Sequence, residues 1–437
     1  MTTTPAAFPN ELLLKIFADL PPSDVHSVAL CSQLLRALAC EFVFATFHFT
    51  PYAFDSETRV LRGPTGYQKE DLLDKLAFFA SESIAPHVTS IVLNRLQRKP
   101  GLADPPYKRS PFESPFAGDE ATHALLLPFF ATLDAFRKVH TLRVERVTFT
   151  ALAVEALAQL RGLHTFTAIT SSCTAGLRCS PPTLLVGVKL TGTRFTDITL
   201  TALPVFPHVT TLALPLDCRP RQSVLPQLNT AFPAVESLVV DGYGGSGWPA
   251  PAADPAMLPR LSKLDIHDAG AAPFLAAAAG PVTQLTVRWS QALALRNSLA
   301  AVPPAQLATV TSLELQLENC KRPTFAALCG CFPALEDFKA ALHVSHKDHT
   351  HADTEAILAL VAAIPDFLPR GLRRLRLYYM DSEADEPAEN FVVPDPRTLF
   401  TQLRTRCAAL SAVELMVPFL ALEWDGVVEP NGLSQHA

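Results

Sequence analysis

Histidines and cysteines gather in one stretch of the chain where they could bind a metal ion. His343, His346, His349 and His351 follow Cys329 and Cys331, and imidazole and thiolate groups are the usual ligands of zinc. Their spacing matches no closed four-ligand zinc site, and nothing in the sequence supplies the hydrogen bonds that orient such ligands. We therefore expect a polar loop after a strand, and no metal.

A second stretch could bind a nucleotide. Residues 242–247, Gly-Tyr-Gly-Gly-Ser-Gly, fit the GxGxxG pattern of dinucleotide sites and follow a predicted strand. Such a site also needs a helix whose N-terminus holds the pyrophosphate, and residues 248–255 contain three prolines that oppose one. We expect a flexible loop without a cofactor. Because the chain also lacks Walker A, HExxH, GxSxG and EF-hand sequences, we expect no enzyme.

The composition excludes several classes of protein. Apolar residues make up 49% of the 437 residues and charged residues 18%, which excludes wholesale disorder. The net charge of −6 gives no bulk attraction to nucleic acid or anionic membranes. Nine scattered cysteines without a CxxC pair indicate reduced thiols and an intracellular protein, cytoplasmic or nuclear. We expect no signal peptide at the start, which lacks a basic region and carries Glu11 and Asp19. The longest apolar stretches, 271–281 and 356–365, are too short to span a bilayer. We expect a soluble protein.

The first fifty residues predict three short helices. A helix can begin at Pro9, and Pro21-Pro22 ends it; a second follows over Val25–Leu30 and a third over Gln33–Cys40. One face of the first helix collects the apolar residues Leu12, Leu13, Ile16, Phe17 and Leu20. This face is larger than so small a core needs, so we expect a partner helix to cover it.

The residues from Phe8 to Ser32, F-P-N-E-L-L-L-K-I-F-A-D-L-P-P-S-D-V-H-S-V-A-L-C-S, resemble the F-box, the three-helix module that docks on Skp1 in cullin–RING ubiquitin ligases. The resemblance covers about residues 8–47 and departs conservatively at Phe8, Val25, Leu30 and Leu35. It is carried by Pro9, Glu11, Leu12, Leu13, Ile16, Phe17, Leu20, Asp24 and Cys31. The resemblance implies Skp1 contacts through Pro9, Leu12, Leu13, Ile16, Phe17, Leu20 and Val25.

A repeat fills most of the remaining chain. The pattern apolar-x-x-apolar-x-apolar recurs twelve times, first at Val88/Ile91/Leu93 and last at Leu410/Val413/Leu415, and eight successive intervals average about 24.5 residues. Five copies have a proline two residues earlier, which ends a helix and starts an extended segment. Short helices are expected between strands, at Ala151–Leu160, Gln291–Ala301, Thr324–Cys331 and Asp353–Ile364.

This pattern resembles an irregular leucine-rich-repeat array over about residues 86–420. It predicts an α/β solenoid in which stacked strand–helix units form a parallel curved sheet; another α/β fold with parallel strands is the alternative. The asparagine that the family places eight residues after the first leucine is absent from every unit. Something else must therefore satisfy the backbone there, and we expect irregular coils.

The sequence thus predicts an F-box domain at 1–50, linker helices at 51–85, the solenoid at 86–423 and a loosely ordered tail at 424–437. Residues 97–120 and 381–390 interrupt the repeat with proline, glycine or acidic residues, and we expect loops there. Ser110 and Ser114, each followed by proline, could accept phosphate, but a plain solvated loop is the simpler expectation.

Side chains between the buried positions of each strand should line the concave sheet face, the usual binding surface of a solenoid. Our candidates for target contact are Lys263, Asp265, His267, Arg288, Glu314, Lys339, Arg374, Arg376 and Tyr378. The F-box resemblance then implies a substrate-recognition subunit of an SCF ubiquitin ligase, with Skp1, a cullin and an unknown target protein as partners. The alternative is a repeat-based interaction scaffold outside any ligase.

Overall fold

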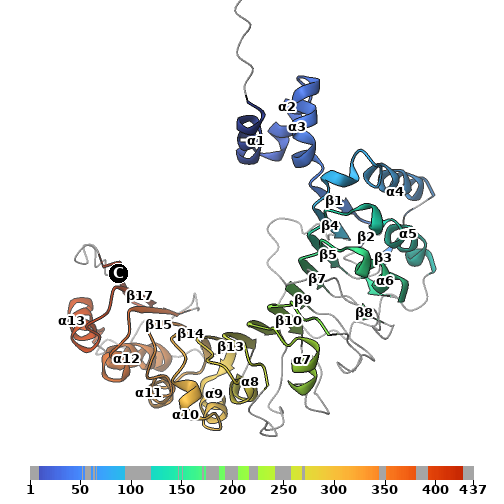
Figure 1. Ribbon diagram of the computed structural model, residues 1–437. Coiled ribbons are helices and arrows are strands. Elements are labelled where there is room, and N and C mark those ends of the chain that lie inside the picture. The colour runs from blue at the N-terminus through green and yellow to red at the C-terminus, as the bar shows by residue number, and fades with distance from the viewer. Residues whose placement is uncertain are drawn as a thin grey trace, which may run out of the picture. The chain divides into compact units, whose positions relative to one another are not determined.

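In the computed structural model (Figure 1), the chain forms two compact units, residues 1–209 and 210–437. Both units are mixed α/β. The structure describes residues 9–51, 53–54, 61–62, 64, 66–93, 120–145, 147–149, 151–169, 172–173, 187–191, 205–215, 225–241, 257–267, 271–343, 351–379 and 392–426.

Three helices open the first unit, as expected: α1 (Asn10–Asp19), α2 (Pro22–Ala29) and α3 (Gln33–Val43). Prolines mark the starts of α1 and α2, where the first helical N–H groups need no intrahelical partner. The Ser32 side chain caps α3 by accepting a hydrogen bond from the backbone N–H of Leu35. The three helices bury Phe17, Val25 and Ala39 between them, with Phe42 edge-on to Phe17.

A parallel sheet follows in the same unit, with its strands ordered β1-β4-β5-β7-β9. Its strands are β1 (Thr46–Phe49), β4 (Ser90–Leu93), β5 (Thr141–Glu145), β7 (Thr165–Ile169) and β9 (Gly187–Thr191). Two small sheets pair β2 (Ala53–Phe54) with β3 (Leu61–Arg62) and β6 (Thr148–Phe149) with β8 (Ser172–Cys173). The helical elements are α4 (Gly66–Phe79), η1 (Ala85–His87), α5 (Glu120–Ala131), η2 (Leu133–Ala135) and α6 (Ala151–Gln159).

Stacked phenylalanines pack strand β1 against the helical elements that follow it in the chain. The ring of Phe47 stacks on Phe79 from α4 with centroids 4.4 Å apart and on Phe136 at 5.7 Å, and Phe49 stacks on Phe129 from α5 at 5.3 Å. Phe47 and Phe49 lie on β1, a strand that the sequence analysis did not expect within residues 1–50. This aromatic cluster packs residues from the predicted F-box domain, linker and repeat region into one apolar core.

The second unit repeats strand and helix. Its parallel strands are β10 (Thr211–Pro215), β11 (Ser237–Asp241), β12 (Lys263–His267), β13 (Gln284–Gln291), β14 (Ser312–Glu318), β15 (Asp337–His343), β16 (Arg374–Tyr379) and β17 (Ala412–Val417). Its helices are α7 (Leu225–Ala231), α8 (Ala271–Ala277), α9 (Ala292–Leu299), α10 (Pro304–Leu307), α11 (Arg322–Gly330), α12 (His351–Phe367) and α13 (Pro396–Arg406). The helices line one side of the strands, where α11 packs between α9 and α12 (Figure 1).

The recurring apolar triples form the core between strands and helices. All members from Leu261 to Leu415 in the second unit are buried, because alternate strand residues face the helices. Backbone hydrogen bonds also link neighbouring units before each strand. The carbonyl of Thr311, for example, accepts from the N–H groups of both Glu336 and Asp337, and the carbonyl of Glu336 accepts from Arg373 and Arg374. This carbonyl ladder connects successive units at the start of their strands.

Helix α12 and strand β18 differ from the sequence expectation. Helix α12 continues through Pro365 to Phe367, three residues beyond the expected end. Strand β18 (Leu420–Trp424) pairs antiparallel with β17 through a turn at Pro418-Phe419, although the sequence analysis foresaw no further strand after the last repeat. None of the described helices has both the length and the apolar character to cross a bilayer.

Candidate protein-interaction surfaces

Helix α1 presents an exposed apolar surface. Leu12 and Ile16 lie one helical turn apart on the same side of α1 and remain 44% and 45% exposed. The next residue, Phe17, is only 3% exposed because it faces the three-helix core. Leu30 and Leu34 are also exposed. Large apolar side chains exposed on so small a module indicate a protein-binding surface.

The seven residues expected to contact Skp1 fall into three environments. Pro9, Leu12 and Ile16 are exposed, Leu13 and Leu20 are half-buried, and Phe17 and Val25 are buried in the core of this chain. In this structure Phe17 and Val25 therefore pack in the three-helix core beneath the exposed surface of α1. Exposed Leu34 is a further candidate that the sequence analysis missed, because the three-helix pattern does not show which side of the third helix stays uncovered.

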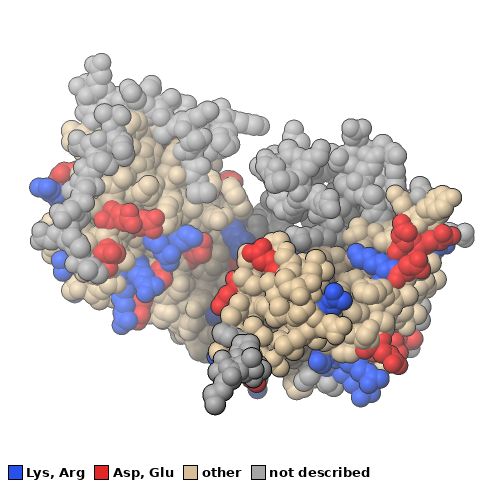
Figure 2. All heavy atoms as spheres, turned by 90° about the horizontal axis from the view of Figure 1, so that it is seen from above, with Lys and Arg blue, Asp and Glu red and all other residues tan. Residues whose placement is uncertain are grey.

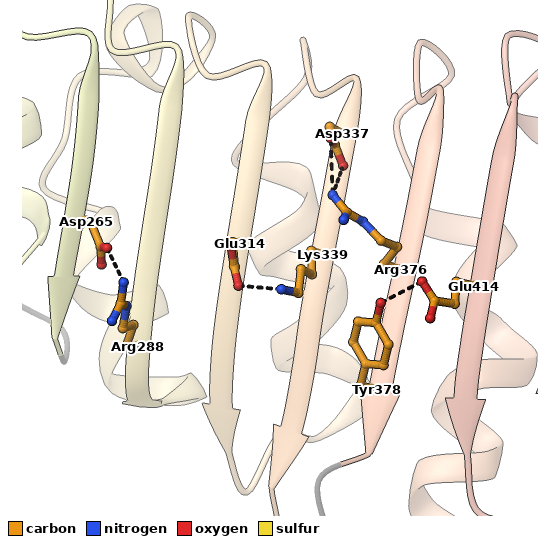
Figure 3. Close-up of polar contacts among 8 residues, drawn as sticks. All are labelled: Asp265, Arg288, Glu314, Asp337, Lys339, Arg376, Tyr378 and Glu414. Atoms are coloured by element: carbon orange, nitrogen blue, oxygen red, sulfur yellow. Dashed lines mark hydrogen bonds and ion pairs between the residues drawn. The ribbon is translucent and has the colours of Figure 1, made fainter. Parts of the chain in front are cut away.

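A second surface is the face of the second unit's sheet that points away from the helices, here called the polar face (Figure 3). The strand register aligns its side chains in rows across the strands. One row contains Asp265, Thr286, Glu314, Lys339, Arg376 and Glu414, and the preceding row contains Lys263, Gln284, Ser312, Asp337 and Arg374. The polar face thus brings together eight of the nine candidate target contacts; the side chain of His267 lies outside the described residues.

Ion pairs across neighbouring strands neutralise much of the polar face. Lys339 Nζ lies 2.8 Å from a carboxylate oxygen of Glu314, and Arg376 donates to Asp337 at 3.2 Å. Arg288 pairs with Asp265 in the same way. Each of these side chains is partly exposed, so each pair adds at most about 1 kcal/mol to stability. Their main effect is to hold the side chains in fixed directions.

Lys263 and Arg374 carry positive charge on the polar face with little compensation. Lys263 forms no ion pair with the described residues, and Arg374 approaches Asp337 only to 4.0 Å. Both side chains are exposed, so both are open to an acidic group of a partner.

A hydrogen bond links Tyr378 to Glu414 at the far end of the polar face. The Tyr378 hydroxyl donates to a Glu414 carboxylate oxygen at 2.6 Å, and Lys339 Nζ lies 5.9 Å from the centre of the tyrosine ring. Burial, together with the hydrogen bond to Glu414 and its negative charge, raises the pKa of Tyr378 to about 12. Because the folded pKa is the higher one, this contribution to stability is complete below the ordinary pKa near 10 and is lost as the pH rises toward 12.

We expect Glu414→Gln to lower the pKa of Tyr378, because the substitution removes the negative charge beside the phenol but keeps an acceptor. The measurement is a near-ultraviolet absorbance titration of folded protein, with Tyr378→Phe subtracted to isolate this one phenol. Glu314→Gln is the matched control, since Glu314 makes only a minor contribution to this pKa. A Tyr378 pKa that stays unchanged in Glu414→Gln would contradict the assignment.

The sheet of the first unit carries a row of small hydroxyl residues. Its register aligns the small hydroxyl residues Thr46, Ser90, Thr141 and Thr165 across four strands. The Arg143 guanidinium donates to Glu145, 2.5 Å away, whose carboxylate is buried. Among the described residues on the face seen in Figure 2, Lys and Arg side chains are interspersed with Asp and Glu.

The structure describes only part of the metal candidate and none of the nucleotide candidate. Burial raises the pKa of the Cys329 and Cys331 thiols, which disfavours the thiolate that binds zinc. His346, His349 and residues 242–247 lie outside the described residues, as does the side chain of His351. In the part of the chain that the structure describes, no three His, Cys, Asp or Glu residues gather as a metal site would require.

The N-terminal helices match a known domain family. The model of the F-box domain family matches residues 7–45. These residues contain helices α1 to α3 and end just before β1. No curated protein matches the chain.

Proposed function

Residues 7–45 form an F-box domain, and from this premise we propose that the chain is a substrate-recognition adaptor of an SCF ubiquitin ligase. The observation that carries the proposal is the domain match together with Leu12 and Ile16 exposed on α1. F-box proteins are typically adaptors rather than enzymes. The proposed partners are a Skp1-type protein, a cullin bound through it, and a target protein, all inside the cell in the cytoplasm or nucleus.

We propose that Skp1 covers α1, with direct contacts from Pro9, Leu12, Leu13, Ile16 and Leu20. Phe17 and Val25 shape this surface from the core. The exposed apolar area is suited to such a partner because burying it removes apolar surface from water, and the three-helix core is too small to cover it alone.

The remaining chain would bind the target. We propose that its strand–helix units form a leucine-rich-repeat-like solenoid, supported by the sequential parallel pairing from β10 to β17 and by the carbonyl ladder. The polar face would then be the target-binding surface. Its candidate contacts are Lys263, Asp265, His267, Arg288, Glu314, Lys339, Arg374, Arg376 and Tyr378.

The mechanism is positioning. An adaptor that holds a target near a ubiquitin-loaded enzyme raises the effective concentration of the target's lysines beside that enzyme. The stacked aromatic cluster supports this role, because Phe47 and Phe49 pack the strand that follows the F-box against α4 and α5. No residue of this chain needs to take part in the chemistry.

The alternative function is a protein-interaction scaffold that binds Skp1 without a ligase, or binds no Skp1 at all. Affinity purification of the full chain with quantitative mass spectrometry, with and without proteasome inhibition, separates these possibilities. Recovery of both a Skp1-type protein and a cullin, with targets that accumulate on inhibition, supports the adaptor. Recovery of Skp1 without a cullin favours the scaffold, and recovery of neither refutes the adaptor proposal.

A further inference from the structure

One row of the polar face is apolar rather than charged. The register aligns Gln316, Ala341, Tyr378, Met416 and Ala421 across β14 to β18, and we call this set the apolar row. Met416 is 50% exposed, Tyr378 and Ala421 are half-buried, and Ala341 is small and buried. The neighbouring row contains Glu314, Lys339, Arg376 and Glu414 (Figure 3).

An exposed tryptophan lies at the β13 end of the apolar row. The register between β13 and β14 shifts between Val287 and Ser290, so that Arg288 and Trp289 both oppose the single residue Gln316. Trp289 adopts a positive φ of 52° at this bulge and remains 45% exposed. Its ring lies 4.5 Å from that of His343 on β15, which places it against the polar face. Exposed tryptophan and tyrosine are the side chains that most often anchor a bound protein.

The neighbouring row carries negative charge where it reaches β17 and β18, beside Met416 and Ala421 of the apolar row. Glu414 on β17 is directly opposite Glu423 on β18, and two like charges in this arrangement repel each other. Glu414 accepts a hydrogen bond from the neutral Tyr378 hydroxyl, but in the described part of the chain no cation pairs with either glutamate. By contrast, Glu314 and Asp337 are compensated by Lys339 and Arg376. A cation from a partner would neutralise the negative charge of Glu414 and Glu423.

We propose that the apolar row binds an extended segment of the target protein in which an aliphatic or aromatic side chain is followed closely by lysine or arginine. The apolar side chain lies on Met416 and Tyr378, and the basic side chain pairs with Glu414 and Glu423. From Trp289 to Met416 the row crosses four strand spacings, roughly 19 Å, which an extended peptide of about six residues spans. This inference rests on the proposed function, because it names the class of segment that the target-binding surface accepts.

The test uses the full-length chain, immobilised, and a displayed library of random peptides long enough to cross the row. Selected peptides should be enriched in an apolar residue followed by lysine or arginine. Met416→Glu should weaken binding of a selected peptide about tenfold, because it places a charge in the apolar contact. The pair Glu414→Lys/Glu423→Lys should instead select acidic residues at the basic position, a change that simple loss of folding cannot produce.

Matched controls lie on the helix side of the same unit. Leu293 on α9 is 54% exposed, so Leu293→Glu makes the same kind of change as Met416→Glu away from the polar face. Asp366 on α12 is exposed, so Asp366→Lys controls for charge reversal. Both control variants should bind the selected peptide as the unchanged chain does, and the thermal unfolding of every variant is recorded.

Several outcomes would overturn the inference. The inference is wrong if no class of peptide is enriched, if acidic or wholly polar peptides are enriched, or if Met416→Glu leaves binding of the selected peptide intact. A dimer of the chain in sedimentation that Met416→Glu dissociates would make a second copy the occupant instead. Binding to a Skp1-type adaptor is measured in the same preparations. If the chain binds the adaptor but selects no peptide, the proposed peptide site on the apolar row is wrong and the proposed ligase role stands. If the chain binds a peptide but not the adaptor, the proposed ligase role is wrong.

Discussion

The double substitution Leu12→Asp/Ile16→Asp should abolish binding to a Skp1-type adaptor while the three helices stay folded. Both side chains are nearly half exposed on α1, so aspartate at these positions meets water in the free chain. In the complex each carboxylate would be buried against an apolar partner without compensation. Central apolar contacts of an interface each contribute about 2 kcal/mol or more, so the affinity should fall at least about 100-fold. Isothermal titration calorimetry with the purified adaptor measures this.

The control for this experiment is Leu127→Asp, a change at an α5 leucine that is 48% exposed and thus comparable in exposure to Leu12. It should bind the adaptor as the unchanged chain does. Circular dichroism should show the same helix content in all variants. If the double variant still binds with unchanged affinity, the α1 surface is not the docking site.

Phe17→Ala, a substitution directly beside Ile16 in the sequence, should unfold the F-box helices. Phe17 is 3% exposed and packs with Val25, Ala39 and Phe42. Removing a buried phenylalanine costs about 3–5 kcal/mol, and a three-helix core of this size has little stability to lose. Hydrogen exchange should therefore lose protection across α1 to α3, while strands β10 to β17 in the other unit remain protected.

Ile16→Ala is the matched comparison, because an exposed side chain contributes little to folding and its loss should change the free energy of unfolding by less than about 0.5 kcal/mol. The two neighbouring positions thus separate folding from binding. Retained exchange protection in Phe17→Ala would show that the helices are held by something other than their own core.

Much of the first fifty residues and of the strands could be predicted from local patterns. Pro9 and Pro21-Pro22 set the ends of α1, and the apolar spacing between them identified the face that includes Ile16. The repeated triples located the buried residues of β12 to β17, because alternation within a strand is a local property. The helices predicted between strands also formed, within a few residues of their expected ends.

Features that depend on pairing between distant segments could not be predicted. The residues of β1 lie within the first fifty residues, where the sequence predicted only helices, and they form a strand by pairing with β4, about forty residues later. The bulge at Trp289 and the pairing of Glu314 with Lys339 depend on the register between strands that lie more than twenty residues apart. The sequence alone does not show which charged residues of the polar face form ion pairs. The strand register shows that Glu314 and Asp337 have cationic partners, whereas Glu414 lies opposite Glu423.

The antiparallel strand β18 limits how such a chain can lengthen by gene duplication. A new parallel unit must dock its strand on a free edge, but the outer edge of β17 is already occupied by β18. A copy inserted after Trp424 would have to pair with β18, which runs antiparallel to the repeat strands, so we expect added units upstream of Leu420. Homologues of different length should therefore vary in their middle repeats and keep the closing hairpin.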